Sequence, residues 1–257
     1  MAKAYLLTLN DNNDINLTEE LFEHLIKLCP QALYRRLNRF VNHNDVKRCL
    51  LGYLLARWAI SIETSQPLST ITIEKDKYGK PQCLTTPSIH FSISHSGPFV
   101  VCAVDDELIG IDVETVRQVN LSIIDDCFAS NEQEYLLRTN DSGDSSEAEH
   151  NSTFFEIWTK KESYLKRDGR GLTAPPTSFS VLDTLPDTFF HKVFAEKEGK
   201  SGHKYVRESF ICHVCSSKQK TPIQTCLNLS RLCTLLDINP SVLRPQYSLI
   251  YHTKKQI

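Results

Sequence analysis

The sequence has little net charge and no long apolar run, and these absences limit what the protein can be. Its 29 Lys and Arg residues nearly balance its 31 Asp and Glu residues, which leaves a formal net charge of −2. Such a balance creates no global field that favours nucleic acid, so we expect no nucleic-acid partner. The apolar stretch within MAKAYLLTLNDNND is too short for a signal peptide or a membrane span. We therefore expect a cytoplasmic protein without membrane attachment.

The chain also lacks the paired ligands that a structural zinc site requires. Only ICHVC, residues 211–215, has C-x-x-C spacing, and no second pair of Cys or His stands near it at suitable spacing. On a strand, Cys212 and His213 would point to opposite faces. The number of cysteines is odd and their spacing is scattered, so we interpret them as reduced and mostly buried: Cys29, Cys49, Cys83, Cys102, Cys127, Cys212, Cys215, Cys226 and Cys233.

Helical patterns dominate the first quarter of the chain. Residues 18–28 predict a helix capped by Thr18, and a stronger helix begins near Asn44 or Asp45. Basic side chains cluster at or just before the second helix. They indicate either a solvated charged face or an anion site, because a helix N-terminus also offers free N–H groups. The cluster comprises Arg35, Arg36, Arg39, Lys47 and Arg48.

A β-rich centre follows, and a second helix-then-strands pattern comes after it. Residues 89–95, 99–104 and 108–114 predict three strands, whose short links favour an antiparallel meander. Residues 128–137 predict a helix with Ser130 and Gln133 as a capping box, and polar residues 139–152 predict a mobile loop. A long helix is expected from about Phe154. Further strands are expected at 178–182, 188–194 and 209–215, a helix within 226–238 and a late strand at 247–251. The repeated pattern suggests two similar halves that meet near residue 105.

Two carboxylates share one face of the strand IGIDVET, residues 109–115. Alternation places Ile111 and Val113 on one face and Asp112 and Glu114 on the other. Two such carboxylates repel each other when water is excluded, and they suit a divalent cation such as Mg²⁺. The other interpretation is an exposed strand face, which is common in antiparallel sheets.

The helix sequence WTKKESYLK, residues 158–166, adds a third carboxylate between lysines. Glu162 and Lys166 lie one turn apart on one face, so they form either a surface ion pair or part of a functional cluster. One acid with the cations Lys161 and Lys166 suits phosphoryl transfer, where charge neutralisation carries much of the catalysis.

Four motifs in order, YGKP, FSISHSG, GIDVE and WTKKESYLK, resemble those of the Sfp-type 4′-phosphopantetheinyl transferases over about residues 33–215. The resemblance implies a Mg²⁺-dependent enzyme that transfers the phosphopantetheine arm of coenzyme A to a serine of an apo acyl or peptidyl carrier protein, releasing 3′,5′-ADP. It also implies an α/β (α+β) monomer of two pseudo-symmetric halves, each a small, mostly antiparallel sheet with helices, around a central cleft.

The same resemblance assigns roles to domains and side chains. Residues 1–105 would bind the 3′-phosphate side of coenzyme A, residues 106–218 would hold the metal and catalytic acids, and residues 219–257 form an extension without an assigned role. The implied metal ligands are Asp112, Glu114 and Glu162; the implied catalytic residues are Glu162, Lys166 and Asp112; and the implied coenzyme A contacts are Arg36, Arg48, Lys80, Ser94, His95 and Lys161.

Other positions of the resemblance are less central. Glu132 stands where the family often has an acid near the site, and Leu33 stands where it often has a basic contact, which Arg35 would replace. Two other functions remain open. The acids and lysines would also serve a metal-dependent pyrophosphate hydrolase, and a non-catalytic module would bind coenzyme A or a carrier protein without chemistry.

Overall fold

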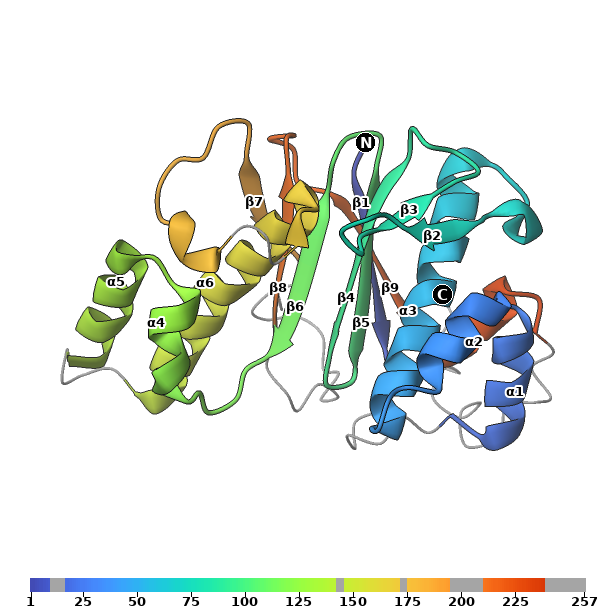
Figure 1. Ribbon diagram of the computed structural model, residues 1–257, viewed down its shortest axis with the longest axis horizontal. Coiled ribbons are helices and arrows are strands. Elements are labelled where there is room, and N and C mark those ends of the chain that lie inside the picture. Colours follow the sequence, from blue (N-terminus) through green and yellow to red (C-terminus); the bar gives the residue numbers. More distant parts are fainter. Residues whose placement is uncertain (10–16, 142–145, 172–174, 195–209, 239–257) are drawn as a thin grey trace, which may run out of the picture.

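The computed structural model describes residues 1–9, 17–141, 146–171, 175–194 and 210–238. Two sheets stand side by side at the centre, and the helices lie on their outer sides (Figure 1). One sheet has four strands in the order β4-β5-β1-β9, and the other has three in the order β6-β8-β7. Helices α1–α3 lie beside the first sheet and α4–α6 beside the second. The predicted mixed α/β class with two lobes is therefore confirmed.

The first lobe contains most of the N-terminal elements. They are β1 (Lys3–Thr8), α1 (Glu19–Lys27), α2 (Gln31–Leu37), α3 (His43–Thr64), the hairpin β2 (Ile73–Lys75) and β3 (Pro81–Cys83), β4 (His90–Ser96) and β5 (Phe99–Asp105). The second lobe contains β6 (Gly110–Thr115), α4 (Ile124–Cys127), α5 (Ser130–Asp141), α6 (Glu147–Asp168), β7 (Phe189–Lys192) and β8 (Phe210–Ser216).

The segment that follows β8 returns to the first lobe. Strand β9 (Ile223–Asn228) pairs in parallel with β1, with Lys3 opposite Ile223 and Thr8 opposite Asn228. Helix α7 (Leu229–Leu235) then buries Leu232 and Cys233 in the same core as α3. The described part of the tail therefore completes the first sheet. The strand expected at 247–251 lies outside the described residues.

The predicted meander is wrong at its third strand. Strand β6 pairs with β8, in register from Gly110 opposite Cys215 to Thr115 opposite Phe210, and not with β5. On its other side β6 runs beside β4 through serine hydroxyls: the Ile111 N–H donates to Ser92 Oγ at 3.1 Å, and the Thr115 N–H donates to Ser96 Oγ at 3.1 Å. The two sheets therefore meet along β4 and β6.

Three local predictions are also corrected. The expected loop over 139–152 is helical in most of its described part, because α5 continues to Asp141 and Ser146 and Glu149 form a capping box that starts α6; residues 142–145 lie outside the described residues. The Ser130–Gln133 capping box does not form, since the Glu132 carboxylate accepts from the Ala129 N–H and starts α5 instead. Residues 178–182 form no strand, whereas the helix expected over 18–28 is confirmed with Thr18 as its cap.

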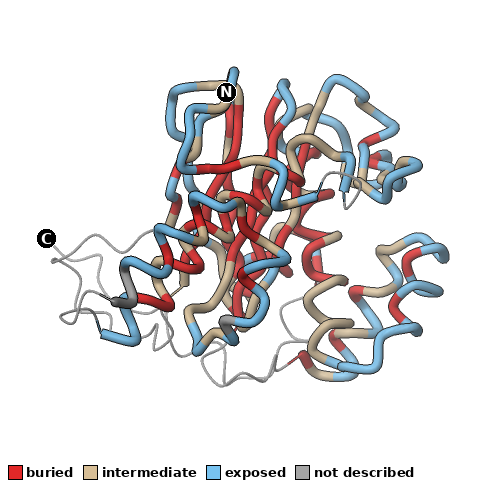
Figure 2. The backbone as a smooth tube through the Cα atoms, turned by 60° about the vertical axis from the view of Figure 1, so that its left-hand side comes forward, coloured by how far each residue is buried: buried red, intermediate tan, exposed pale blue. Residues whose placement is uncertain are grey.

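Apolar packing holds both lobes. Figure 2 shows buried residues concentrated in the central strands, with exposed residues along the outer helices. Helix α3 buries Leu50, Leu54 and Leu55 against the first sheet, as its pattern predicts. All nine cysteines are free thiols, in agreement with the reduced state expected. Within the described ranges, no helix combines the length and apolar character needed to cross a bilayer.

Candidate active site between the two sheets

The site forms where β4, β6 and α6 meet. Ile111 and Val113 are fully buried in the apolar cluster that β6 shares with β1, β5 and β8, so the alternate residues Asp112 and Glu114 face α6 and the neighbouring strand β4. Helix α6 lies against β6 at Gly110, where an added Cβ would lie only 1.9 Å from the Ser163 carbonyl oxygen. The absence of a side chain at residue 110 therefore brings the α6 side chains within reach of the strand.

Asp112 is buried and joins all three elements. Its Oδ1 accepts from Ser94 Oγ of β4 at 2.7 Å and from Lys166 Nζ of α6 at 2.6 Å. Lys166 Nζ also lies 2.8 Å from Ser94 Oγ. Oδ2 is buried without a hydrogen-bond partner among the described residues. Burial raises the pKa of Asp112 despite the opposing effects of Lys166 and Ser94.

Glu114 is held at the end of β6 by two donors. Ser96 Oγ of β4 donates to Glu114 Oε2 at 2.7 Å, and Arg117 Nη1 donates to the same oxygen at 3.0 Å. Because Ser96 also accepts from the Thr115 N–H, the carboxylate is tied to both strands. Asp112 and Glu114 thus each pair with one hydroxyl of β4 and one cation.

Glu162 lies on α6 one turn before Lys166. Burial and the negative charge of Asp112 raise the pKa of Glu162, while Lys166 opposes that rise. Glu114 contributes in the same direction as Asp112. Three carboxylates that influence one another in this way favour a shared cation or a proton.

A cationic group lies beside this acidic cluster. Arg48 of α3 donates through Nη1 to the Gly97 carbonyl at 3.0 Å and through Nη2 to Asp45 at 2.7 Å. The ring of His95, on the opposite face of β4 from Ser94, is exposed. The protein around His95 nevertheless displaces enough water to lower its pKa, and Arg48 and Lys166 lower it further. Arg48 and Lys166 therefore form a positive region suited to phosphate oxygens, and the His95 ring beside them offers a neutral hydrogen-bonding group.

Arg36 and Lys80 lie farther from the acids. Arg36 is exposed on α2, with its guanidinium 6.0 Å from the ring centre of Phe40. Lys80 donates from Nζ to the Arg167 carbonyl at 2.8 Å, and burial lowers its pKa. Lys80 thereby links the β2–β3 hairpin to the C-terminal end of α6.

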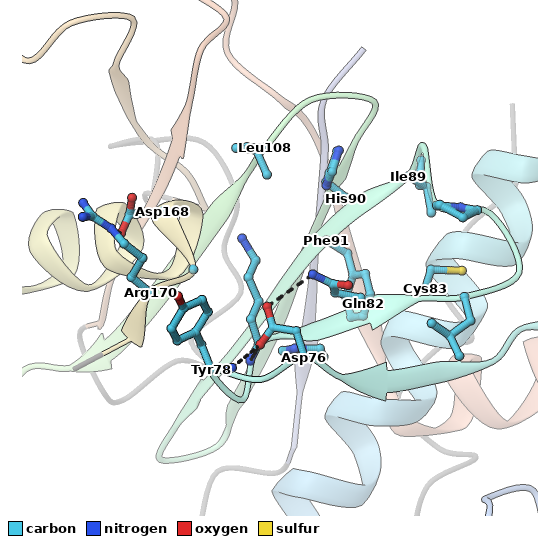
Figure 3. Close-up of a pocket in the computed structure, with 15 residues that line it drawn as sticks. Asp76, Tyr78, Gln82, Cys83, Ile89, His90, Phe91, Leu108, Asp168 and Arg170 are labelled. Carbon is cyan, nitrogen blue, oxygen red and sulfur yellow. Dashed lines mark hydrogen bonds and ion pairs between the residues drawn. The ribbon is translucent and has the colours of Figure 1, made fainter. Parts of the chain in front are cut away.

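A cavity of about 320 Å³ opens beside Lys80. In Figure 3, Tyr78, Asp76 and Gln82 come from the hairpin, His90 from the start of β4, and Asp168 and Arg170 from the end of α6. The cavity therefore lies at the start of β4, whereas Arg48 and His95 lie near its end.

Lys161 corrects one assignment of the sequence analysis. The structure places it away from solvent at 0% exposure, where Nζ donates to Glu132 Oε2 at 2.6 Å and to the Phe179 carbonyl at 2.6 Å. Glu132 in turn accepts from the Val181 N–H at 2.7 Å. One residue corresponds to about 100° around a helix, so Lys161 faces the lobe's interior while Glu162 faces the site. Lys161 is therefore a core residue, not a coenzyme A contact.

The histidine within the C-x-x-C segment already has two polar partners. His213 is buried, with Nδ1 2.8 Å from Thr159 Oγ1 and Nε2 3.2 Å from Glu156 Oε2. Across the described ranges, no three His, Cys, Asp or Glu side chains are arranged as a ready metal site. The acids of β6 and α6 are no exception, because Lys166 pairs with Asp112 and Arg117 pairs with Glu114.

Sequence reasoning missed two residues that hold the site together. The predicted strand over 89–95 ends one residue before Ser96, but Ser96 belongs to β4 and donates to Glu114. Its position in the alternation Ser92, Ser94, Ser96 is the signal that would have identified it. Arg117 had no pattern to mark it, because its contact with Glu114 depends on how the chain leaves β6.

Comparisons with known proteins identify the family of this chain. Residues 16–107 match the family described as 4′-phosphopantetheinyl transferase, N-terminal, and residues 108–221 match the 4′-phosphopantetheinyl transferase superfamily. The 4′-phosphopantetheinyl transferase Sfp of Bacillus subtilis (strain 168) is 35% identical over 168 residues, which are 65% of this chain and 72% of that protein. The 4′-phosphopantetheinyl transferase gsp of Aneurinibacillus migulanus is 34% identical over 201 residues, which are 77% of this chain and 81% of that protein.

A more distant mammalian relative also matches. The L-aminoadipate-semialdehyde dehydrogenase-phosphopantetheinyl transferase of Rattus norvegicus is 29% identical over 150 residues, which are 53% of this chain and 47% of that protein. The motif order, the two-lobed fold and the matches to both family regions agree. The chain belongs to the Sfp-type 4′-phosphopantetheinyl transferase family.

Proposed function

We propose that this protein transfers the 4′-phosphopantetheine group of coenzyme A to a serine of an apo carrier protein, at the junction of β4, β6 and α6. The observation that carries the site assignment is the cluster of Ser94, Asp112 and Lys166, whose polar atoms lie 2.6–2.8 Å apart. Family membership supports the reaction and coenzyme A as its substrate. The cluster of Ser94, Asp112 and Lys166 supports the junction of β4, β6 and α6 as the place where the reaction occurs.

Mg²⁺ fits this site through Asp112, Glu114 and Glu162. Asp112 Oδ2 has no partner among the described residues and the pKa of Glu162 is raised, so the charge of these carboxylates is not fully compensated by the part of the protein that the structure describes. Oxygen ligands of this kind suit Mg²⁺, which is usually completed by water and substrate phosphates. When bound, the ion would offset the negative charge of the diphosphate.

The chain's own residues account for the remaining steps. Arg48 and His95 bind the 3′-phosphate of coenzyme A, and Arg36 adds positive charge for the same phosphate from α2. Lys80 offers its ammonium to coenzyme A from the place where the β2–β3 hairpin meets the end of α6. Ser94 orients Asp112. Glu162, as the third carboxylate of the cluster, accepts the proton of the carrier serine.

Bond formation and cleavage then balance within one displacement. The serine oxygen forms a bond to the β-phosphorus, and the bond from that phosphorus to the bridging oxygen breaks. The leaving 3′,5′-ADP retains the electron pair and the charge that Lys166 stabilises.

A mass-shift assay on an apo carrier protein tests the proposal. With coenzyme A and Mg²⁺, the wild type should add one phosphopantetheine to the carrier, and Asp112→Asn should not. Cleavage of coenzyme A without a mass gain would identify a hydrolase. Binding of coenzyme A without either change would identify a non-catalytic module.

Four further expectations stay predictions. They are a monomeric state, a cytoplasmic location, the absence of a nucleic-acid partner and the division into residues 1–105, 106–218 and 219–257. Size-exclusion chromatography with light scattering tests the first of them.

A further inference from the structure

Arg117 has no part in the proposed reaction, yet it contacts one of the site's acids. It stands two residues beyond the end of β6, and its Nη1 lies 3.0 Å from Glu114 Oε2 and 3.2 Å from the Thr115 carbonyl. The guanidinium also lies 5.1 Å from the ring centre of Phe155 on α6. The aromatic face and the carboxylate together hold this cation at the edge of the site.

Glu114 does not depend on Arg117 for its position. Ser96 Oγ donates to the same Oε2 at the shorter distance of 2.7 Å, and Ser96 is itself tied to the backbone of β6 by the Thr115 N–H. Removal of the guanidinium would therefore leave the carboxylate in place but without its protein cation.

The two cations on the acids of β6 differ in exposure. The side chain of Lys166 is 30% exposed and that of its partner Asp112 is 4% exposed, whereas Arg117 is 59% exposed and Glu114 is 21% exposed. An exposed ion pair contributes little net free energy, because water solvates both charges after separation. The Arg117–Glu114 pair is thus the easier one to open.

We propose that Arg117 competes with the divalent cation for Glu114 and so weakens the protein's affinity for that metal. This inference rests on the proposed role of Asp112, Glu114 and Glu162 as metal ligands. Whichever oxygen of Glu114 meets the metal, the guanidinium repels a second cation at that carboxylate. Metal binding opens the Arg117–Glu114 pair, so Arg117 tunes how much metal the protein needs.

Metal binding without turnover tests the competition. Mn²⁺ is titrated into the full-length protein with coenzyme A present and no carrier protein, and the free ion is followed by electron paramagnetic resonance. Displacement of Mn²⁺ by Mg²⁺ then gives the Mg²⁺ dissociation constant. Arg117→Ala should lower both dissociation constants by about two- to fivefold, the range expected from loss of an exposed pair. Arg117→Lys, which keeps the charge, should lie close to the wild type.

Arg138→Ala is the matched control. Arg138 forms a similar exposed pair with Glu134 on α5, so its loss removes one positive charge without touching the site acids. This control should leave metal affinity unchanged, and thermal melts check that all variants remain folded. Unchanged or weaker metal binding by Arg117→Ala would overturn the inference, the weaker result meaning that Arg117 orients Glu114.

A further variant shows whether a negative result concerns the competition by Arg117 or the proposed metal ligands themselves. If Asp112→Asn binds Mn²⁺ as tightly as the wild type, the proposed ligand set is wrong and the competition fails with it. If Asp112→Asn loses binding but Arg117→Ala does not tighten it, only the competition is wrong.

Discussion

The ammonium of Lys166 lies 2.6 Å from Asp112 Oδ1, which joins the last turns of α6 to the middle of β6 across 54 residues of sequence. Ser94 from the other sheet contacts both groups, so one contact set connects both lobes. The same ammonium is therefore a structural partner of Asp112 and, in the proposed reaction, a stabiliser of the leaving group.

Lys166→Ala should reduce turnover more than coenzyme A binding. The ammonium acts mainly on charge that develops during transfer, so we expect kcat to fall by about 10²–10³-fold with a much smaller change in the coenzyme A dissociation constant. Steady-state kinetics with an apo carrier protein and direct coenzyme A titration measure the two quantities. Lys160→Ala on the same helix is the control, and equal losses in kcat and affinity would contradict a transition-state role.

Removal of only one partner of the buried Lys161–Glu132 ion pair should strongly destabilise the protein. Lys161→Met leaves a buried carboxylate without its cation, so we expect unfolding free energy to fall by about 3–5 kcal/mol. The double variant Glu132→Gln/Lys161→Met removes both charges and keeps an acceptor for the Val181 N–H, so it should be more stable than the single variant. Urea denaturation measures both, and a double variant less stable than Lys161→Met would exclude this explanation.

Gly110→Ala should separate α6 from β6. The new Cβ would meet the Ser163 carbonyl oxygen at 1.9 Å and the Arg167 nitrogen at 2.6 Å, both of which are backbone atoms that cannot rotate away. We expect a loss of about 1–3 kcal/mol or more, together with a loss of transfer, because Lys166 moves with the helix. Gly52→Ala meets the end of the Ile93 side chain at 3.0 Å and should have the smaller effect in the same thermal melts and activity assays.

Acid should weaken the second lobe through Glu156. Burial opposes ionisation, but hydrogen bonds and charges from His213 and Lys192 lower its pKa from 4.5 to about 2. Because the pKa of Glu156 is lower in the folded than in the unfolded protein, its ionised form stabilises the fold above pH 4.5. That stabilisation is lost as pH falls from about 4.5 towards 2. Glu156→Gln should remove that contribution, about 1–2 kcal/mol after allowance for partial exposure. Denaturation at several pH values tests this, and a variant whose stability falls as steeply with acid as the wild type would refute it.

The acids and the lysine of the candidate site stand out in the sequence because their spacing is local. Alternation along a strand fixes Asp112 and Glu114 on one face wherever that strand lies, and helical periodicity places Glu162 and Lys166 one turn apart. The same local rules predicted α1 with its Thr18 cap, and they predicted α3, although that helix begins at His43 with Asn42 as its cap rather than near Asn44 or Asp45. They also suggested the order of helices and strands in the two lobes.

Only tertiary structure decided which elements became neighbours. The residue pattern of β6 is equally compatible with β5 or β8 as its partner, because pairing depends on how the rest of the chain folds. The parallel pairing of β9 with β1 depends on the overall fold in the same way. Lys161 and Lys166 differ little as sequence letters, and it is the packing of α6 that buries one against Glu132 and brings the other to Asp112. Periodicity determines the face on which a side chain lies, whereas long-range packing determines what that face meets.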